Sequence, residues 1–322
     1  NSGNAYYGIT VDYDRMHRPV AKNQQMGQTG MLFPGDVTVG YGLNYNYSAT
    51  HKFRLESVYR HHFRSEADVM VEGDVIHDVC RFSYDYNGNM TGIVTDRPAA
   101  DGHTERRIAE RKLLWDEENR LRAVDDNGFI SCYFYDHTGR RTIKLTGGGR
   151  HTYVNGSADT DSTDTRNCTI YPGPNTVFSF SDGAYRQGRL SRHIYAGNER
   201  ILTAVSLRKP VLTSASGTSR RPFEAQKDTL QSLVKQIYTD CGVPFKGIDN
   251  TAPSVGPVVD AESVYFYHPD HLGSTTLLTD ATGRPTQRVE YAPFGELFLD
   301  RRDGTTWHTP YLFNAKELDE ET

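Results

Sequence analysis

The chain has 322 residues, of which 36% are hydrophobic, so it can form one large or two ordinary domains but is not suited to a thick, dry core. Its formal net charge of −5 is modest, and its lysine and arginine residues are spread along the sequence, which argues against nucleic acid as the main partner. No apolar run approaches the ~18 residues of a membrane helix, so we expect no membrane span.

From the N-terminus onward, short units repeat one order: an aromatic residue, Asp, a few polar residues, Gly or Asn, and then Arg or Asn with an apolar residue. The Asp side chain is expected to cap a hairpin turn, the Gly to supply a positive φ, and the aromatic ring to pack across the strand pair. Such periodicity indicates a repeat architecture in which each unit buries its face only against its neighbours. The two clearest copies contain Tyr84, Asp85 and Gly88, and Tyr135, Asp136 and Gly139.

These repeats predict a first segment, residues 1–207, built of consecutive antiparallel hairpins. Two stretches within it, 147–149 and 155–167, are rich in Gly, Ser, Thr and Asp and are predicted to be loops. Tyrosine, which occurs 20 times, suits strands that are apolar on one side and wet on the other.

The second predicted segment, residues 208–257, is an insertion with one helix over 223–241. Its apolar residues recur at the spacing of one helix face, and Gly242 and Pro244 are expected to end it. We expect this helix to pack on the sheet, and the alternative is a face for a partner or an enclosed cargo. The apolar positions are Leu230, Leu233, Val234, Ile237 and Tyr238.

The third segment, residues 258–322, contains a hairpin whose strands, 275–279 and 286–291, flank the turn 280–283. Just before it, His268, Asp270 and His271 lie within four residues, a density that would suit a metal-dependent hydrolase. The preferred interpretation is a structural turn, in which Asp270 caps backbone amides and Gly273 makes the bend. The residues of this signature are Tyr267, His268, Asp270, His271, Leu272, Gly273, Tyr291, Pro293, Phe294 and Gly295.

The phrases HPDHLGS and EYAPFGE, together with the tyrosine-aspartate repeats and residues 310–322, closely resemble the repeat-associated core of bacterial Rhs proteins, the YD-repeat family. This resemblance covers nearly the whole chain. It implies an all-β fold of tandem antiparallel YD-repeat hairpins in a coiling sheet, forming part of a shell, with one inserted amphipathic helix near 223–241. About 20 strands at ~4.8 Å spacing would give only one or two tight turns of such a shell.

The resemblance implies a structural scaffold without enzymatic activity or cofactor, part of an Rhs-like shell that encapsulates, carries or presents a C-terminal toxin. Its partners would be the rest of the shell and the toxin cargo, and another chain could pair with its sheet edges or with the 223–241 helix. The alternative is a cell-surface adhesion module of teneurin-like type that binds glycans. A secreted or cell-surface bacterial location is expected, without a signal peptide in this sequence.

The four cysteines, Cys80, Cys132, Cys168 and Cys241, are far apart in the sequence and form no CxxC pair. Closely spaced pairs are typical of metal and redox sites, and regular spacings are typical of disulfide frameworks. We therefore expect four free thiols.

Overall fold

The computed structural model describes residues 4–29, 37–66, 76–97, 107–147, 151–154, 157–160, 167–181, 188–208, 220–243, 245, 262–291, 295, 297–304 and 307–319. Over these residues the chain forms twenty strands, one α-helix and a short 3-10 helix, and all strand pairs are antiparallel, so the predicted all-β class is confirmed. The chain divides into two compact units, one of residues 1–127 with 150–161 and the other of residues 128–149 with 162–322.

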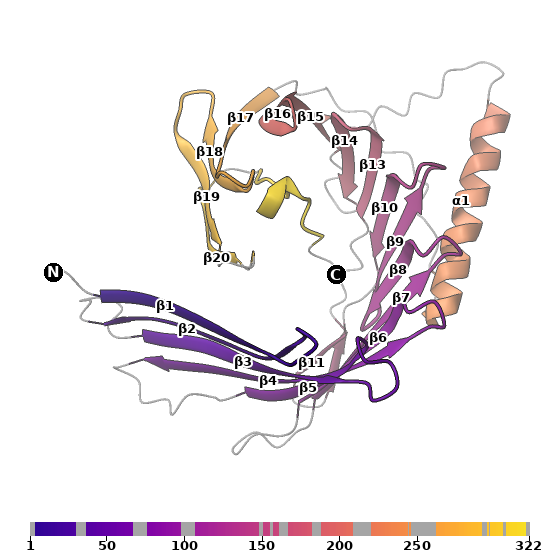
Figure 1. Cartoon of the computed structure of the whole chain (residues 1–322). Helices are drawn as coiled ribbons and strands as arrows, with labels where there is room; N and C mark the ends of the chain where they lie inside the picture. The colour runs from indigo at the N-terminus through magenta and orange to yellow at the C-terminus, as the bar shows by residue number, and fades with distance from the viewer. Residues whose placement is uncertain are drawn as a thin grey trace. The chain divides into compact units, whose positions relative to one another are not determined.

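In the first unit, each strand pairs with the next along the chain, from β1 through β8, which Figure 1 shows as the indigo to magenta strands. A small separate hairpin is made by β11 and β12. The strands are β1 Asn4–Tyr13, β2 Pro19–Thr29, β3 Val37–Tyr47, β4 Leu55–Glu66, β5 Ile76–Tyr84, β6 Met90–Arg97, β7 Arg107–Trp115, β8 Leu121–Asp126, β11 His151–Val154 and β12 Ser157–Thr160.

The second unit has the same sequential order, β9–β10 and then β13 through β20, with β10 pairing with β13. The 3-10 helix η1, Phe313–Ala315, follows the last strand. The strands are β9 Phe129–Tyr135, β10 Arg141–Gly147, β13 Asn167–Gly173, β14 Thr176–Ser181, β15 Gly188–Ala196, β16 Glu199–Arg208, β17 Glu262–Pro269, β18 Thr275–Asp280, β19 Pro285–Tyr291 and β20 Leu297–Arg302.

The buried residues of each unit include polar and charged groups as well as apolar ones. In the second unit one cluster of buried residues consists of Val205, Tyr265, Tyr267, Leu278 and Trp307. In the first unit the fully buried carboxylate of Asp78 forms ion pairs with Arg60 at 2.5 Å and with Arg97 at 3.3 Å. A buried charge needs such partners, because removing it from water without them is costly.

Helix α1, Arg220–Cys241, begins three positions before the predicted start and ends where predicted. Gly242, with φ 75°, donates its amide to the carbonyl of Thr239 and closes the last turn. The helix buries Val234, Ile237, Tyr238 and Cys241, whereas Leu233 is 44% exposed. The assignment of Leu233 to the buried face is therefore wrong, because the contact stripe follows positions i, i+3, i+4 and i+7 from Val234. Leu230 and Pro244 lie outside the residues whose side chains are described.

The other sequence expectations have mixed outcomes. None of the four cysteines forms a disulfide, as predicted. The stretch 155–167 is not all loop: Ser157–Thr160 forms β12 by pairing with His151–Val154, and Asn167 begins β13. The division at 207 and 257 was drawn from motifs, does not coincide with the packing units, and stays a prediction. No helix in the described part of the chain is long and apolar enough to cross a membrane.

Candidate functional site: aspartate turns and aromatic contacts between hairpins

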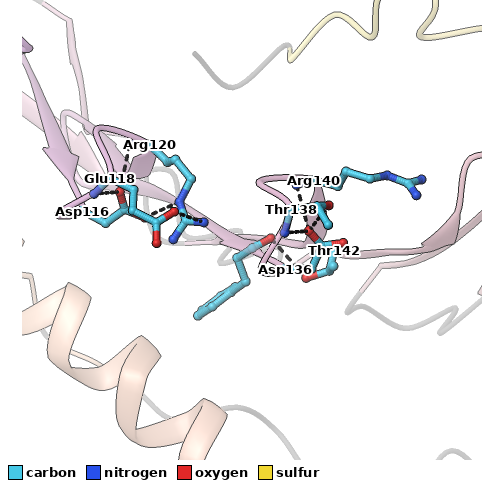
Figure 2. A network of polar contacts seen from close by, with 8 residues as sticks. Asp116, Glu118, Arg120, Asp136, Thr138, Arg140 and Thr142 are labelled. Carbon is cyan, nitrogen blue, oxygen red and sulfur yellow. Dashed lines mark hydrogen bonds and ion pairs between the residues drawn. The ribbon is translucent and has the colours of Figure 1, made fainter.

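One turn geometry recurs through both units, and the turn at Asp136 between β9 and β10 shows it clearly (Figure 2). The amide of Asp136 donates to the carbonyl of Arg140 at 2.9 Å, and the amide of Gly139 donates to the carbonyl of Asp136 at 3.0 Å. The carboxylate oxygen Oδ1 accepts the amides of Thr138 and Arg140 at 2.8 and 3.0 Å. One side chain thus satisfies two amides that the turn would otherwise leave without partners.

Five more turns share this arrangement. In each, the Asp carboxylate accepts the amide of the residue four positions later, at 2.8 to 3.0 Å, and the residue three positions later has a positive φ. The residue with the positive φ is Gly in three of these turns, and Gly adopts this conformation without steric cost. In the other two it is His17 or Asn119, residue types that adopt the left-handed region at some energetic cost. Figure 2 also draws the turn that includes Asp116, Glu118 and Arg120. The five aspartates are Asp14, Asp85, Asp116, Asp270 and Asp280.

These hydrogen bonds favour the ionised form of the carboxylates of Asp14, Asp85 and Asp280. The pKa of Asp14 is lowered chiefly by the Arg18 side chain, that of Asp85 by the Asn89 side chain, and that of Asp280 by the Thr282 hydroxyl. A carboxylate that accepts several donors is stabilised as an anion, and it is a poor general acid at neutral pH. The turn aspartates are therefore structural groups.

Five aromatic residues at strand ends contact the neighbouring hairpin. Tyr84, the last residue of β5, donates its hydroxyl to the carbonyl of Leu55, the first residue of β4, at 2.8 Å. Trp115, the last residue of β7, donates its indole N–H to the carbonyl of Met90, the first residue of β6, at 2.7 Å. The same contact is made by Tyr47 to Pro19, Tyr195 to Pro174 and Tyr291 to Thr275, at 3.0, 3.4 and 2.7 Å.

Arginines reinforce these contacts between hairpins. The guanidinium of Arg18 lies 4.5 Å from the ring centre of Tyr47, and that of Arg54 lies 5.1 Å from the ring centre of Tyr84. Arg18 is itself held by the carboxylate of Asp14 at 2.7 Å. A chain of contacts therefore runs from the aspartate of one turn through its arginine to the aromatic ring of the next hairpin.

In the second unit the segment 307–319 is fixed to the sheet by a buried hydrogen-bond chain. The hydroxyl of Tyr267 lies 3.1 Å from that of Thr203 and 2.7 Å from that of Thr309. The amide of Thr309 donates to the Gln287 side chain at 3.0 Å, and the hydroxyl of Thr275 donates to the carbonyl of Tyr311 at 2.7 Å. All six residues are buried, so the chain satisfies polar groups that could not reach water.

The far end of this segment is held by charge. Arg141 on β10 forms ion pairs with Glu317 at 3.0 Å and with Asp319 at 2.7 Å. Lys144 contacts Asp319 at 3.0 Å, and the Tyr171 hydroxyl donates to Glu317 at 2.9 Å. Burial raises the pKa of Asp319, but Arg141 and Lys144 lower it by a larger amount, so the net shift of the pKa is downward.

The residues of the predicted signature occupy different surroundings. Tyr267 is buried in the hydrogen-bond chain, Tyr291 contacts Thr275, and Asp270 makes the turn. A Cβ at Gly295 would lie 2.7 Å from the ring of Phe313, so the ring approaches the backbone there. Leu272 is 57% exposed, and His271 is also exposed. Pro293 and Phe294 lie outside the described residues.

The histidines near Asp270 do not converge on it. The Nε2 atom of His268 lies 3.0 Å from the hydroxyl of Thr279, and the carboxylate of Asp270 accepts the amides of Leu272 and Ser274. Among the described residues, no group of three or more His, Cys, Asp or Glu residues is placed to hold a metal ion.

Sequence reasoning missed the partners of the 307–319 segment. Thr203, Thr309, Arg141 and Lys144 belong to no motif, and their roles depend on contacts across large sequence distances. The sequence contains no signal for these contacts, because a lysine such as Lys144 in a strand-like run is usually exposed.

Neither a family model nor a curated protein matches this chain. Solved structures do: a crystal structure of TcdB2-TccC3-TEV shares 12% identity and a TM-score of 0.41, over 97% of this chain and 17% of that one. A Photorhabdus luminescens Tc holotoxin pore shares 13% identity and a TM-score of 0.40, over 98% of this chain and 16% of that one. At these values the likeness decides neither family nor function, so the resemblance to Rhs proteins stays a prediction.

Proposed function

We propose that the chain is a non-enzymatic scaffold, part of a secreted or cell-surface Rhs-like shell that encapsulates, carries or presents a toxin. The observation that supports this role is the recurrence of two contacts. An aspartate fixes the turn in six hairpins. An aromatic residue ties one hairpin to the one before it in five places. These aspartate and aromatic side chains stabilise the register of the paired strands.

Several carboxylates that could serve chemistry have structural roles in the described part of the chain. The carboxylates of Asp14, Asp85, Asp116, Asp136 and Asp280 accept backbone amides of their own turns. Those of Glu317 and Asp319 anchor a segment to the sheet. Catalytic acids usually have pKa values shifted toward neutrality, whereas those of the turn aspartates Asp14, Asp85, Asp136 and Asp280 are lowered.

The test is limited proteolysis of the full-length parent protein, with the isolated downstream domain as the comparison. Encapsulation predicts that the enclosed domain is cut far more slowly than the free domain at equal protease concentration. A parent carrying Trp115→Phe, which removes one tie between hairpins, should lose part of this protection. Equal cutting rates for enclosed and free domains would end the proposal.

A second candidate, a glycan-binding adhesion surface, is favoured by exposed aromatic rings at the hairpin ends of the first unit. Tyr13 is 59% exposed, Phe53 is 73% exposed and Tyr86 is fully exposed. The hairpin ends that carry them touch one another, because Arg18 donates to the carbonyl of Lys52 and Tyr84 donates to that of Leu55. Exposed rings in a row are suited to stacking on sugar rings.

A glycan array probed with the purified chain tests this candidate. Binding should be lost when Tyr13, Phe53 and Tyr86 are changed together to Ala, and should persist when the exposed Leu297 and Leu299 are changed instead. An array without any binding above background would remove the candidate and leave the scaffold proposal untouched.

A further inference from the structure

Arg200, the second residue of β16, is a buried cation within a cage of tyrosine rings. The residue is 8% exposed, and its guanidinium carbon lies 3.4 Å from the ring centre of Tyr311. The ring centres of Tyr195 and Tyr267 lie 5.3 and 5.8 Å away. One nitrogen, Nη2, donates to the hydroxyl of Tyr195 at 2.9 Å. The electron-rich faces of these rings partly compensate the charge, but they carry no net negative charge.

No carboxylate in the described part of the chain forms an ion pair with Arg200, and its Nε and Nη1 atoms have no hydrogen-bond partner there. His193, which packs edge-on to Tyr311 at 5.0 Å between ring centres, does not supply one. Burial and the charge of Arg200 lower the pKa of His193 to about 3, so the imidazole is neutral. A buried guanidinium without an anion among the described residues is unusual, because buried charges in proteins are normally paired.

A cavity of about 250 Å³ adjoins Arg200, where the β15–β16 turn, the 270–274 turn and η1 meet. Its polar wall includes Asn198, Glu199 and Asn314, and its apolar wall includes Leu272 and Ala315. Asn314 and Ala315 both have positive φ values, 51° and 54°, which residues with a Cβ adopt at some cost. Backbone strain of this kind is concentrated at ligand-binding sites.

We propose that this cavity binds a small monocarboxylate, with the Arg200 guanidinium as its counter-ion. Arginine presents N–H donors in a planar fork that suits a carboxylate, and the amide groups of Asn198 and Asn314 are further donors on the wall. The exposed carboxylate of Glu199 disfavours dianions such as phosphate. The volume is below the ~300–1,000 Å³ of drug-sized ligand sites, so the ligand is a short-chain group.

Two sources share this chemistry, a free short-chain acid and an acidic side chain of a peptide. The full chain should be titrated with sodium propionate, with acetyl-Gly-Glu-Gly-amide, with propionamide as the neutral isostere, and with inorganic phosphate. Binding is followed through the side-chain amide NMR signals of Asn198 and Asn314. We expect a Kd of about 1 mM for propionate, and at least tenfold weaker binding of propionamide and phosphate. Tighter binding of the peptide would identify the side chain as the source, and tighter binding of propionate the free acid.

Variants test the charge assignment separately. Glu199→Gln, at an exposed position, should strengthen phosphate binding about threefold to tenfold. Arg200→Met keeps the aliphatic volume and should weaken propionate binding at least tenfold, while Arg192→Gln, an exposed arginine on β15, should leave it unchanged. If Arg200→Met fails to fold, the phosphate titration of Glu199→Gln tests the charge assignment instead. Equal responses to propionate and propionamide, or phosphate binding that Glu199→Gln does not change, would overturn the inference, which does not depend on the scaffold role.

Discussion

In the repeat at Tyr84 and Asp85, the tyrosine and the aspartate perform different tasks, although they are adjacent in the sequence. Asp85 acts within its own turn, because its carboxylate accepts the amide of Asn89 at 2.8 Å. Tyr84 acts between hairpins, because its hydroxyl donates to the carbonyl of Leu55. The dipeptide therefore couples the local geometry of one hairpin to the position of the previous one.

Replacing Tyr84 by Phe should isolate the contact between hairpins. The ring and its stacking with Arg54 remain, while the hydrogen bond to the carbonyl of Leu55 is lost. We expect the free energy of unfolding to fall by about 1 kcal/mol, the net value of one such bond. Urea denaturation measures it, with Tyr86→Phe as the control, because Tyr86 is fully exposed and its hydroxyl has no partner among the described residues. An equal loss in both variants would contradict the assignment.

Replacing Asp14 by Ala should lower the melting temperature at pH 7 and have no effect in strong acid. The pKa of Asp14 in the folded state lies below its ordinary value of 3.8, chiefly because of Arg18. The unfolded state therefore binds more protons as the pH falls through 3.8, and the carboxylate's contribution is present above that pH and lost below it.

Melting temperatures of wild type and Asp14→Ala, measured from pH 7 down to about pH 2, should therefore converge at the acid end. Arg15→Ala provides the matched control, because Arg15 is the exposed neighbour in the same turn. A difference that stays constant down to about pH 2 would mean that Asp14 acts through something other than its charge.

At the level of single residues, the sequence predicts a great deal about turns and less about side-chain partners. The capping role of Asp and the positive φ of Gly88 and Gly139 follow from local chemistry, which the order of residues contains. The partner of each aromatic residue does not, because a ring can pack within its own strand pair or reach the next one. The predicted packing across the strand pair therefore missed the hydrogen bond from Tyr84 to Leu55, which crosses to the previous hairpin.

Among the elements, the segment 307–319 shows most clearly what long-range contacts add. It has almost no regular structure, yet Trp307, Thr309, Tyr311 and Leu312 are buried against the sheet of the second unit. Its charged end depends on Arg141 and Lys144, more than 170 positions earlier in the chain. Local patterns could place the strands and helix α1, but not an irregular segment whose position is set by its partners.

Asp319→Asn should loosen the end of this segment. Arg141 and Lys144 would lose one of their two carboxylate partners, and we expect local protection to fall by about 1–2 kcal/mol at pH 7, given a partly exposed ion-pair network. The folded pKa of Asp319 is lowered, so this stabilisation is lost as the pH falls below its ordinary value of 3.8.

Amide hydrogen exchange over 307–319 measures the loosening, with Lys316→Gln as the control, because Lys316 is exposed in the same segment. Exchange that stays as slow in Asp319→Asn as in wild type would show that the hydrogen-bond chain through Thr309 holds the segment without help from the charges.

For the whole molecule, the decisive property is that strand pairing within each unit follows the order of the chain. In the first unit β1 through β8 form one run of neighbours, and the ties made by Tyr47, Tyr84 and Trp115 also join consecutive hairpins only. Stability in such an array is a sum of terms from units and their nearest neighbours. The sequence predicted this property because its repeats are visible, whereas the arrangement of the units is not encoded in any motif.

A mutation in such an array should have an effect that declines with distance along the run of hairpins. Trp115→Phe removes the indole hydrogen bond to Met90, so amide exchange should accelerate about fivefold in β6 and β7, for a loss of about 1 kcal/mol. The strands β1 and β2, which are separated from this bond by the β3–β4 hairpin, should exchange at the wild-type rate. Exchange measured by mass spectrometry at low urea concentration would resolve the gradient. Uniform acceleration over β1 to β8 would show instead that the first unit unfolds as a single cooperative block, and that its hairpins are not the elementary units of its stability.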